Sequence, residues 1–358
     1  MNSRSPLALL AAALLAACDH GAPFVPRDYR PDGPFDPSSP TRLTLNLGKD
    51  RGPVWLPDGT AILYSVQRFD RADHDHCWAV LPPGGGTIRR YACRTTAEDD
   101  SLNVFEEAAL AADGRLAYVR AGSGLLLGPP LAPGAQALVL ATLANPNDAR
   151  VLLNIGYLAP SGRVHQGVSH IRWLGPDRLV FVGENVTYPR PCSACSADTV
   201  RTGIEIATLD LAAQSPVLAV VSGTDGASSV APGVTGDTIY FTRNGDSRVY
   251  RYAFSSGQTD TIYDFGGAGI ARDLALTNGR LLAVVGGDIS YTVDSVLGPT
   301  QVDNGGTLHL VTLGTGSDTV LGAALTLLRR PAVSPDGTRV AAELWTSRTA
   351  DLWLVEVP

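Results

Sequence analysis

The sequence predicts an all-β fold, a six-bladed β-propeller that is closed by its N- and C-terminal strands in one blade. The first observation is a phrase that recurs six times along the 358 residues. Each copy is an apolar strand, a tight turn with Asp, Asn or Gly, and a second apolar strand. Self-similarity at this spacing is typical of repeat folds, and repeated strand pairs indicate propeller blades. The copies span residues 52–65, 105–121, 168–184, 228–244, 271–287 and 329–344.

The second observation is that candidate third and fourth strands follow the copies. In the first blade they are residues 77–81 and 87–92, and in the second they lie near residue 125 and at 137–143. The last copy is followed only by a third strand, at 351–357. Residues 42–47 (RLTLNL) alternate like a strand before the first copy, so we expect them to complete the last blade. Closure by both ends removes the exposed sheet edges that favour aggregation.

Composition is the third observation. The chain has 38 Gly and 25 Pro, which suits a β protein with many turns. It is 44% hydrophobic and 18% charged, and its formal net charge is −7. A general nucleic-acid role is therefore disfavoured on electrostatic grounds.

The N-terminal segment predicts export. Arg4 is followed by an apolar run over residues 7–17, which is too short to span a bilayer at about 20 residues. The run ends in Leu-Ala-Ala-Cys18, similar to a bacterial lipobox, whose cysteine is lipidated; the alternative is an ordinary secretory signal. We expect a signal peptide at 1–17, the lipidated Cys18 and a flexible tether at 18–40, and the propeller at 41–358. The protein would then be lipid-anchored in the bacterial cell envelope, on the periplasmic side of the inner membrane or at the outer membrane.

Four further cysteines are consistent with an oxidising compartment. Cys77 and Cys93 flank a predicted hairpin turn, so we expect a disulfide across its two strands. Cys192 and Cys195 form a CxxC spacing in a Pro-rich loop. A loop-locking disulfide is favoured there over redox exchange or half of a metal site, because no second CxxC and no thioredoxin-like pattern is present.

The repeat phrase also resembles a known family. The W-x-PDG pattern of residues 55–63, with RLTLN before it, is similar to the WD40-like PD40 repeat of TolB-type six-bladed propellers, and the resemblance covers residues 42–358. TolB carries an α/β domain before its propeller, where this chain has the predicted tether, so its partner-binding N-terminus does not carry over. The resemblance implies turn roles, and no catalytic role, for the turn residues of three copies. These are Asp58, Gly59, Asp113, Gly114, Asp336 and Gly337.

Long insertions are expected on one face of the propeller. Residues 68–76, 184–202 and 288–306 would join second to third strands, and 144–167 would join two blades. Such connections share a face in this topology. Long loops on a rigid rim are a common form of binding surface, although loop length also drifts without function.

The first of these loops carries weak metal-ligand candidates, Asp73, His74, Asp75 and His76. Their spacing matches no calcium or zinc signature, and a solvated charged loop is the more common outcome. His165 and His170 could face the channel, although a core or loop position is more usual for a single histidine. No G-x-S-x-G elbow is present. We therefore predict no catalytic residue and no cofactor, with a divalent metal as the exception to test.

Two functions remain open. The first is a monomeric, membrane-anchored binding module that holds an envelope protein or a peptidoglycan-associated partner on the loop-rich face. The alternative is a carbohydrate-binding protein or a metal-dependent lyase or hydrolase with a site at the channel mouth. A converging cluster of titratable side chains at the channel would favour the alternative. A weakly charged rim would favour the binding module.

Overall fold

The computed structural model is all-β in the part of the chain that it describes. The described residues are 40–44, 48–68, 76–85, 89–94, 105–121, 136–155, 163–187, 201–213, 215–287, 289–294, 298–303, 305–345 and 349–358. Within them the only helical segment is the single 3₁₀ turn Gly266–Ala268. No helix among these residues is long and apolar enough to cross a membrane.

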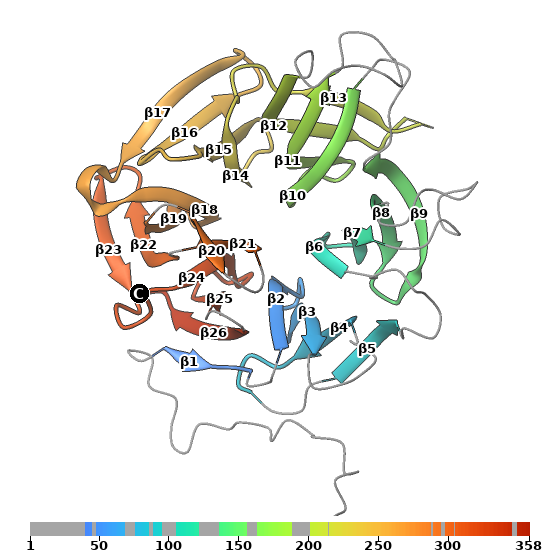
Figure 1. Cartoon of the computed structure of the whole chain (residues 1–358), viewed down its shortest axis with the longest axis horizontal. Coiled ribbons are helices and arrows are strands. Elements are labelled where there is room, and N and C mark those ends of the chain that lie inside the picture. Colours follow the sequence, from blue (N-terminus) through green and yellow to red (C-terminus); the bar gives the residue numbers. More distant parts are fainter. Residues whose placement is uncertain are drawn as a thin grey trace, which may run out of the picture.

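Antiparallel sheets radiate from a common centre (Figure 1). Four sheets have four strands each, in chain order except for one inserted hairpin. Their strands are β6 (Phe105–Leu110), β7 (Arg115–Ala121), β8 (Gln136–Thr142), β9 (Asn145–Ile155); β10 (Arg163–Gly175), β11 (Arg178–Thr187), β12 (Arg201–Asp210), β13 (Val217–Val220); β14 (Ala227–Pro232), β15 (Thr238–Arg243), β16 (Arg248–Ala253), β17 (Gln258–Asp264); and β18 (Ile270–Thr277), β19 (Arg280–Gly286), β22 (Gly306–Thr312), β23 (Ser317–Leu321).

The remaining strands form one longer sheet and a separate hairpin. The hairpin pairs β20 (Ile289–Asp294) with β21 (Gly298–Asp303). The eight-stranded sheet contains the chain's first and last strands. Its members are β1 (Thr41–Arg42), β2 (Gly48–Trp55), β3 (Ile62–Arg68), β4 (His76–Leu81), β5 (Arg89–Arg94), β24 (Leu328–Val333), β25 (Arg339–Trp345) and β26 (Ala350–Glu356).

The first strand of each repeat lies on the inside of the ring. Neighbouring inner strands contact each other in the order β2, β6, β10, β14, β18 and β24, and β24 contacts β2 again. Buried apolar clusters lie between the sheets of successive repeats, so each sheet packs its face on the next. Two tryptophans add inter-repeat bonds. The indole of Trp55 donates to the Ala332 carbonyl at 2.9 Å, and that of Trp173 donates to Ala109 at 3.0 Å.

The two ends of the described chain meet in one sheet. β1 pairs antiparallel with β26, and the Leu43 amide donates to the Leu352 carbonyl at 2.8 Å. Strand pairing between β26 and β2 is limited to one parallel residue pair, Lys49 with Ala350. The expected pairing of both ends is therefore present, but the strand is Thr41–Arg42 and not residues 42–47. Residues 45–47 lie outside the described part.

The second repeat corrects the sequence analysis. The residues predicted as a fourth strand at 137–143 lie, up to residue 142, in the third strand β8, and the region near residue 125 lies outside the described residues. The predicted inter-blade loop 144–167 is wrong, because β9 and the start of β10 take up most of it. Pro and Asn signals at its start concealed the strand. Leu152 and Ile155 bury their side chains against the next sheet, and this tertiary packing outweighs the local turn signals.

The aspartates of three repeat turns accept backbone amides within the turn. A side-chain oxygen of Asp58 accepts the amide of Thr60 at 3.0 Å, and Asp113 and Asp336 each do the same two residues on, at 3.1 Å. The glycines that follow take left-handed φ angles of 71°, 85° and 74° at Gly59, Gly114 and Gly337. Backbone and side-chain hydrogen bonds lower the pKa of all three carboxyls, that of Asp336 to about 2.

Closure of the ring can be tested at Leu43, which is buried beside Trp55 and Leu352. We expect Leu43→Ala to lower the free energy of unfolding by about 2.5 kcal/mol, because it leaves a cavity in the core that joins the chain ends. Urea denaturation measures this change. Val217→Ala, at an exposed position, is the control and should change stability little. Equal effects of the two variants would contradict the closure.

Candidate functional site: the central channel

One repeat position faces the channel in every inner strand. We align the repeats on the turn that ends each inner strand, where backbone hydrogen bonds mark equivalent residues. All six inner strands also carry a register shift near this position. We call the six equivalent residues the first ring. It consists of Gly52, Glu107, His170, Ser229, Asp273 and Arg330.

The first ring contains strained backbone. Glu107 and His170 have φ of 53° and Arg330 has φ of 48°, in the left-handed region that non-glycine residues seldom occupy. Gly52 takes the same conformation, with φ of 59°. Bulges of this kind remove an amide from the sheet ladder and turn it aside. Each such residue costs about 1 kcal/mol or more of folding free energy. Residues strained in this way cluster at functional sites.

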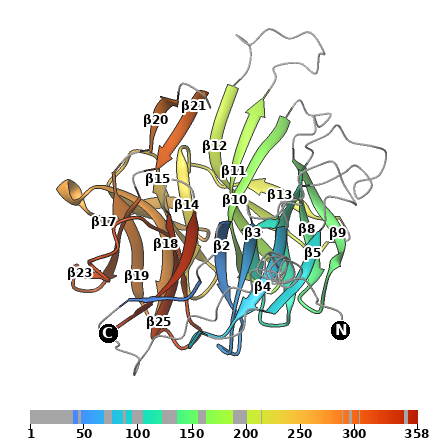
Figure 2. The ribbon, with the colours of Figure 1, turned by 60° about the horizontal axis from the view of Figure 1, so that its bottom comes forward.

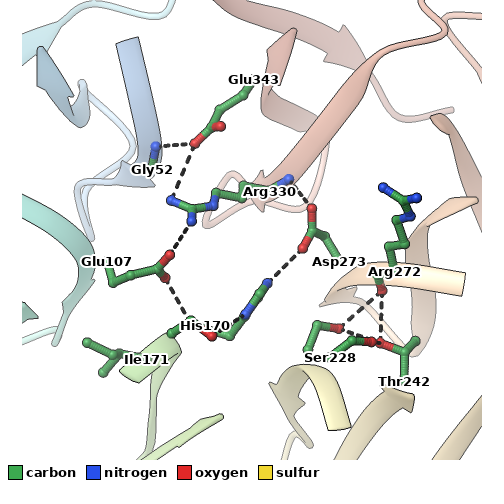
Figure 3. A network of polar contacts seen from close by, with 12 residues as sticks. Gly52, Glu107, His170, Ile171, Ser228, Thr242, Arg272, Asp273, Arg330 and Glu343 are labelled. Carbon is green, nitrogen blue, oxygen red and sulfur yellow. Dashed lines mark hydrogen bonds and ion pairs between the residues drawn. The ribbon is translucent and has the colours of Figure 1, made fainter. Parts of the chain in front are cut away.

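Carboxylates accept the amides that the bulges turn into the channel (Figure 3). The His170 amide donates to Glu107 Oε2 at 2.8 Å, and the Arg330 amide donates to Asp273 Oδ2 at 2.8 Å. The Gly52 amide donates to Glu343 Oε1, from β25. Each left-handed amide of these three strands is thereby satisfied by a carboxylate of another strand.

Arg330 and His170 complete the network. The Arg330 guanidinium forms an ion pair with Glu107 and lies 3.8 Å from Glu343 Oε1. His170 Nε2 lies 2.7 Å from Asp273 Oδ1, so these two groups join strands of two different sheets. The Trp345 indole donates to Glu343 Oε2 at 2.6 Å, and its ring lies between the guanidinium groups of Arg51 and Arg329.

Burial and charge act in opposite directions on these carboxyls. Burial raises the pKa of Glu107, but Arg330 and His170 outweigh it and the pKa is lowered overall. Asp273 behaves in the same way, with His170 and Arg330 lowering its pKa against burial. At Glu343 burial prevails over the nearby Arg330, and its pKa is raised. The channel therefore contains two carboxyls with lowered pKa values, Glu107 and Asp273, and one with a raised pKa, Glu343.

These residues do not fit a divalent cation. No group of three metal-ligating side chains is found in the described residues. The Arg330 guanidinium takes the position between Glu107 and Glu343 that a cation would need. The predicted candidates Asp73, His74 and Asp75 lie outside the described residues, and His76 opens β4 with an undescribed side chain. That hypothesis stays a prediction.

The cysteine predictions are placed only in part. β4 and β5 pair Cys77 directly with Cys93, which is the register that a cross-strand disulfide requires. We keep that disulfide as a prediction. Cys18, Cys192 and Cys195 lie outside the described residues.

Most of the network was missed by the sequence analysis, which considered only His165 and His170 as possible channel residues. Glu107, Asp273 and Arg330 stand inside apolar strands, where a single charged residue attracts little attention. Aligning the six copies would have shown this position, because five of its six residues are polar or charged while the strands around them are apolar. A position that repeats around a ring must converge on the axis.

A cavity of about 320 Å³ continues the channel on the turn side of the first ring. All six inner strands line it, and the Trp55 and Trp173 side chains belong to its wall. It is mostly apolar, and Arg172 is its one charged lining residue.

Comparison with known proteins supports the fold. No protein-family model matches the chain, and no curated protein matches it. Among solved structures, TolB from Acinetobacter baumannii has a TM-score of 0.51 and 13% identity over 88% of this chain and 65% of that chain. A gluconolactonase from Xanthomonas campestris has a TM-score of 0.55 and 14% identity over 92% and 99%. A putative TolB from Agrobacterium tumefaciens has a TM-score of 0.51 and 13% identity over 87% of this chain and 91% of that chain.

These similarities show a β-propeller fold that TolB-like proteins share. The chain spans only 65% of the Acinetobacter TolB. At such low identity the likeness carries no activity, and the same fold hosts both binding proteins and enzymes.

The network makes a stability prediction. Arg330→Met should lower the free energy of unfolding by about 3 kcal/mol, because it leaves Glu107 and Glu343 buried without their cation. Urea denaturation at pH 7 measures this loss. Arg251→Met is the matched control, since its partner Asp260 is exposed and such pairs contribute about 1 kcal/mol or less. A loss at Arg330 no larger than at Arg251 would show that the network is not coupled.

The lowered pKa of Asp273 predicts acid sensitivity. A carboxyl whose folded pKa lies below its unfolded value of about 3.9 contributes stability above that value and loses it as pH falls through the folded pKa. We therefore expect unfolding free energy to fall steeply below about pH 4, and Asp273→Asn to flatten this fall. Urea titrations from pH 6 to pH 2 measure it. If the unfolding free energy of Asp273→Asn fell with pH as steeply as that of the wild type, the lowered pKa of Asp273 would not be the cause of the acid sensitivity.

Proposed function

We propose that the chain is a six-bladed propeller in which the eight-stranded sheet counts as two blades. One blade is β2–β5, and the other is β24–β26 with β1. The link between them is a single residue pair, whereas within each blade whole strands pair. The closed order of six inner strands and the apolar clusters between successive repeats support this count.

We further propose that this propeller is a binding module of the cell envelope, held to the membrane through a lipidated Cys18. The observation that carries the binding role is the projection of two hairpins from one face (Figure 2). β20–β21 is an added two-stranded sheet, and β11–β12 extends its pairing as far as Thr187 with Arg201. Both arise between second and third strands, so they stand on the same side of the ring. The partner would be an envelope protein or a peptidoglycan-associated ligand.

The channel network bears on the alternative function. A converging titratable cluster is present, which is the feature expected of a site at the channel mouth. Its carboxylates, however, accept strained amides and pair with Arg330 and His170, so they act as fixed structural acceptors. A general base must reach the proton that it abstracts, and the oxygens of these carboxylates are already engaged by amides, Arg330 and His170. The binding module is therefore preferred over a lyase or hydrolase.

The hairpin can be removed without touching the ring. β19 and β22 pair up to Gly286 and Gly306, where the backbones are so close that a side chain at Gly286 would lie 1.9 Å from the Gly305 carbonyl. Replacement of residues 288–304 by Asn-Gly should close this hairpin with a two-residue turn. We expect normal thermal stability and a tenfold or greater loss of partner capture. A tenfold loss of affinity corresponds to about 1.4 kcal/mol of binding free energy.

Capture is measured by crosslinking and pull-down from intact cells. Val234→Asp, at a residue 86% exposed on the turn side, is the control and should capture as the native chain does. A Cys18→Ser chain tests the anchor, because loss of the lipid should release the protein from membranes and weaken capture. Unchanged capture by the hairpin variant would remove that hairpin from the binding surface. Membrane retention of the Cys18→Ser chain would refute the lipid anchor.

A further inference from the structure

A second ring of equivalent residues lies two positions beyond the first ring. Its six residues all line the cavity, so this ring also faces the channel. Five of its six members are small or apolar, and Arg172 is the exception. The second ring consists of Val54, Ala109, Arg172, Ala231, Ala275 and Ala332, and all six line the 320 Å³ cavity.

The cavity has the build of a small-ligand site. Its volume falls near the lower end of the range of about 300–1,000 Å³ that is usual for ligand pockets. Trp55 and Trp173 offer aromatic walls, and Pro232 and Pro331 add rigid ones. The carbonyl bonds of the two indoles hold these rings in place without a ligand. Such a pocket favours a compact, flat or branched apolar body.

Arg172 supplies one charge to this apolar pocket. Among the described residues its side chain makes a single hydrogen bond, from a terminal nitrogen to the Ile171 carbonyl at 2.8 Å. A guanidinium has five N–H donors, so several are left to face the cavity. Glu107 and Asp273 act on Arg172 through space, but both are engaged elsewhere and neither forms an ion pair with it.

The position of Arg172 selects for charge as well as shape. Arginine forms two parallel hydrogen bonds with a carboxylate, and these are stronger in a site with little water. Burial lowers the pKa of Arg172, yet an arginine stays protonated at neutral pH. A neutral ligand of equal size would fill the cavity but leave the guanidinium donors without a charged acceptor.

We propose that this cavity binds a small organic carboxylate, with its acid group on Arg172 and its apolar body between the inner strands near Trp55 and Trp173. The site opens on the side of the short repeat turns, since its lining includes Pro335 at the end of β24. It is therefore separate from the hairpin face of the proposed function and does not depend on it. The first ring lies between the cavity and the hairpin side.

The test compares benzoate with benzamide, which has nearly the same shape and no charge. Isothermal titration of the full chain should show benzoate binding at least about tenfold more tightly than benzamide, because charged hydrogen bonds are stronger. In Arg172→Met this preference should vanish. In Ala275→Leu, which fills the cavity and keeps Arg172, both ligands should lose binding. Thermal unfolding confirms that each variant is folded.

Arg251→Met is the matched control, because it removes the same charge from an exposed outer strand and should keep the benzoate preference. The proposal is overturned if native protein binds both ligands equally or binds neither. It is also overturned if the preference persists in folded Arg172→Met, or if benzoate binding survives in Ala275→Leu. In those cases Arg172 would serve only to balance the charge of the first ring. If Arg172→Met does not fold, the native comparison and Ala275→Leu still decide.

Discussion

Strained amides at the centre of the ring, and the carboxylates that accept them, are the interaction on which the channel depends. Inner strands that converge on one axis bulge near the same repeat position, and three of them turn a left-handed amide inward. A buried amide without a partner costs free energy comparable to a lost hydrogen bond. Glu107, Asp273 and Glu343 remove that cost by reaching across from other strands.

This interaction also explains the charges in the channel. Carboxylates placed there for the amides need partners for their charge, and the Arg330 guanidinium pairs with Glu107 while the His170 imidazole lies against Asp273. The resulting network joins β6, β10, β18, β24 and β25, which are far apart in the chain. It links the inner strands to one another at the axis, while the pairing of β1 with β26 joins the two ends of the chain at the outside of the ring.

The network divides the molecule into two sides with different chemistry. Hairpins extend on one side, where a large partner could be held. On the other side the second ring encloses an apolar cavity with one guanidinium. A propeller can carry two unrelated sites in this way, because its two ends are built from different connections and the network lies between them. The low identity to TolB and to the gluconolactonase leaves both sites to be judged from this chain's own residues.

The sequence by itself determined the repeat, and through it the all-β class, the inner strands and their turns. Apolar alternation and the Asp-Gly turns act over a few residues, so they are legible without tertiary structure, as at Asp58 and Asp336. It did not show β9, whose start resembles a loop, because burial of Leu152 and Ile155 against the next sheet decided that strand. Nor did it show that Glu107, His170, Asp273 and Arg330 meet. Only ring closure brings these four residues to one axis, since contacts between distant segments are set by how the sheets pack and not by local sequence.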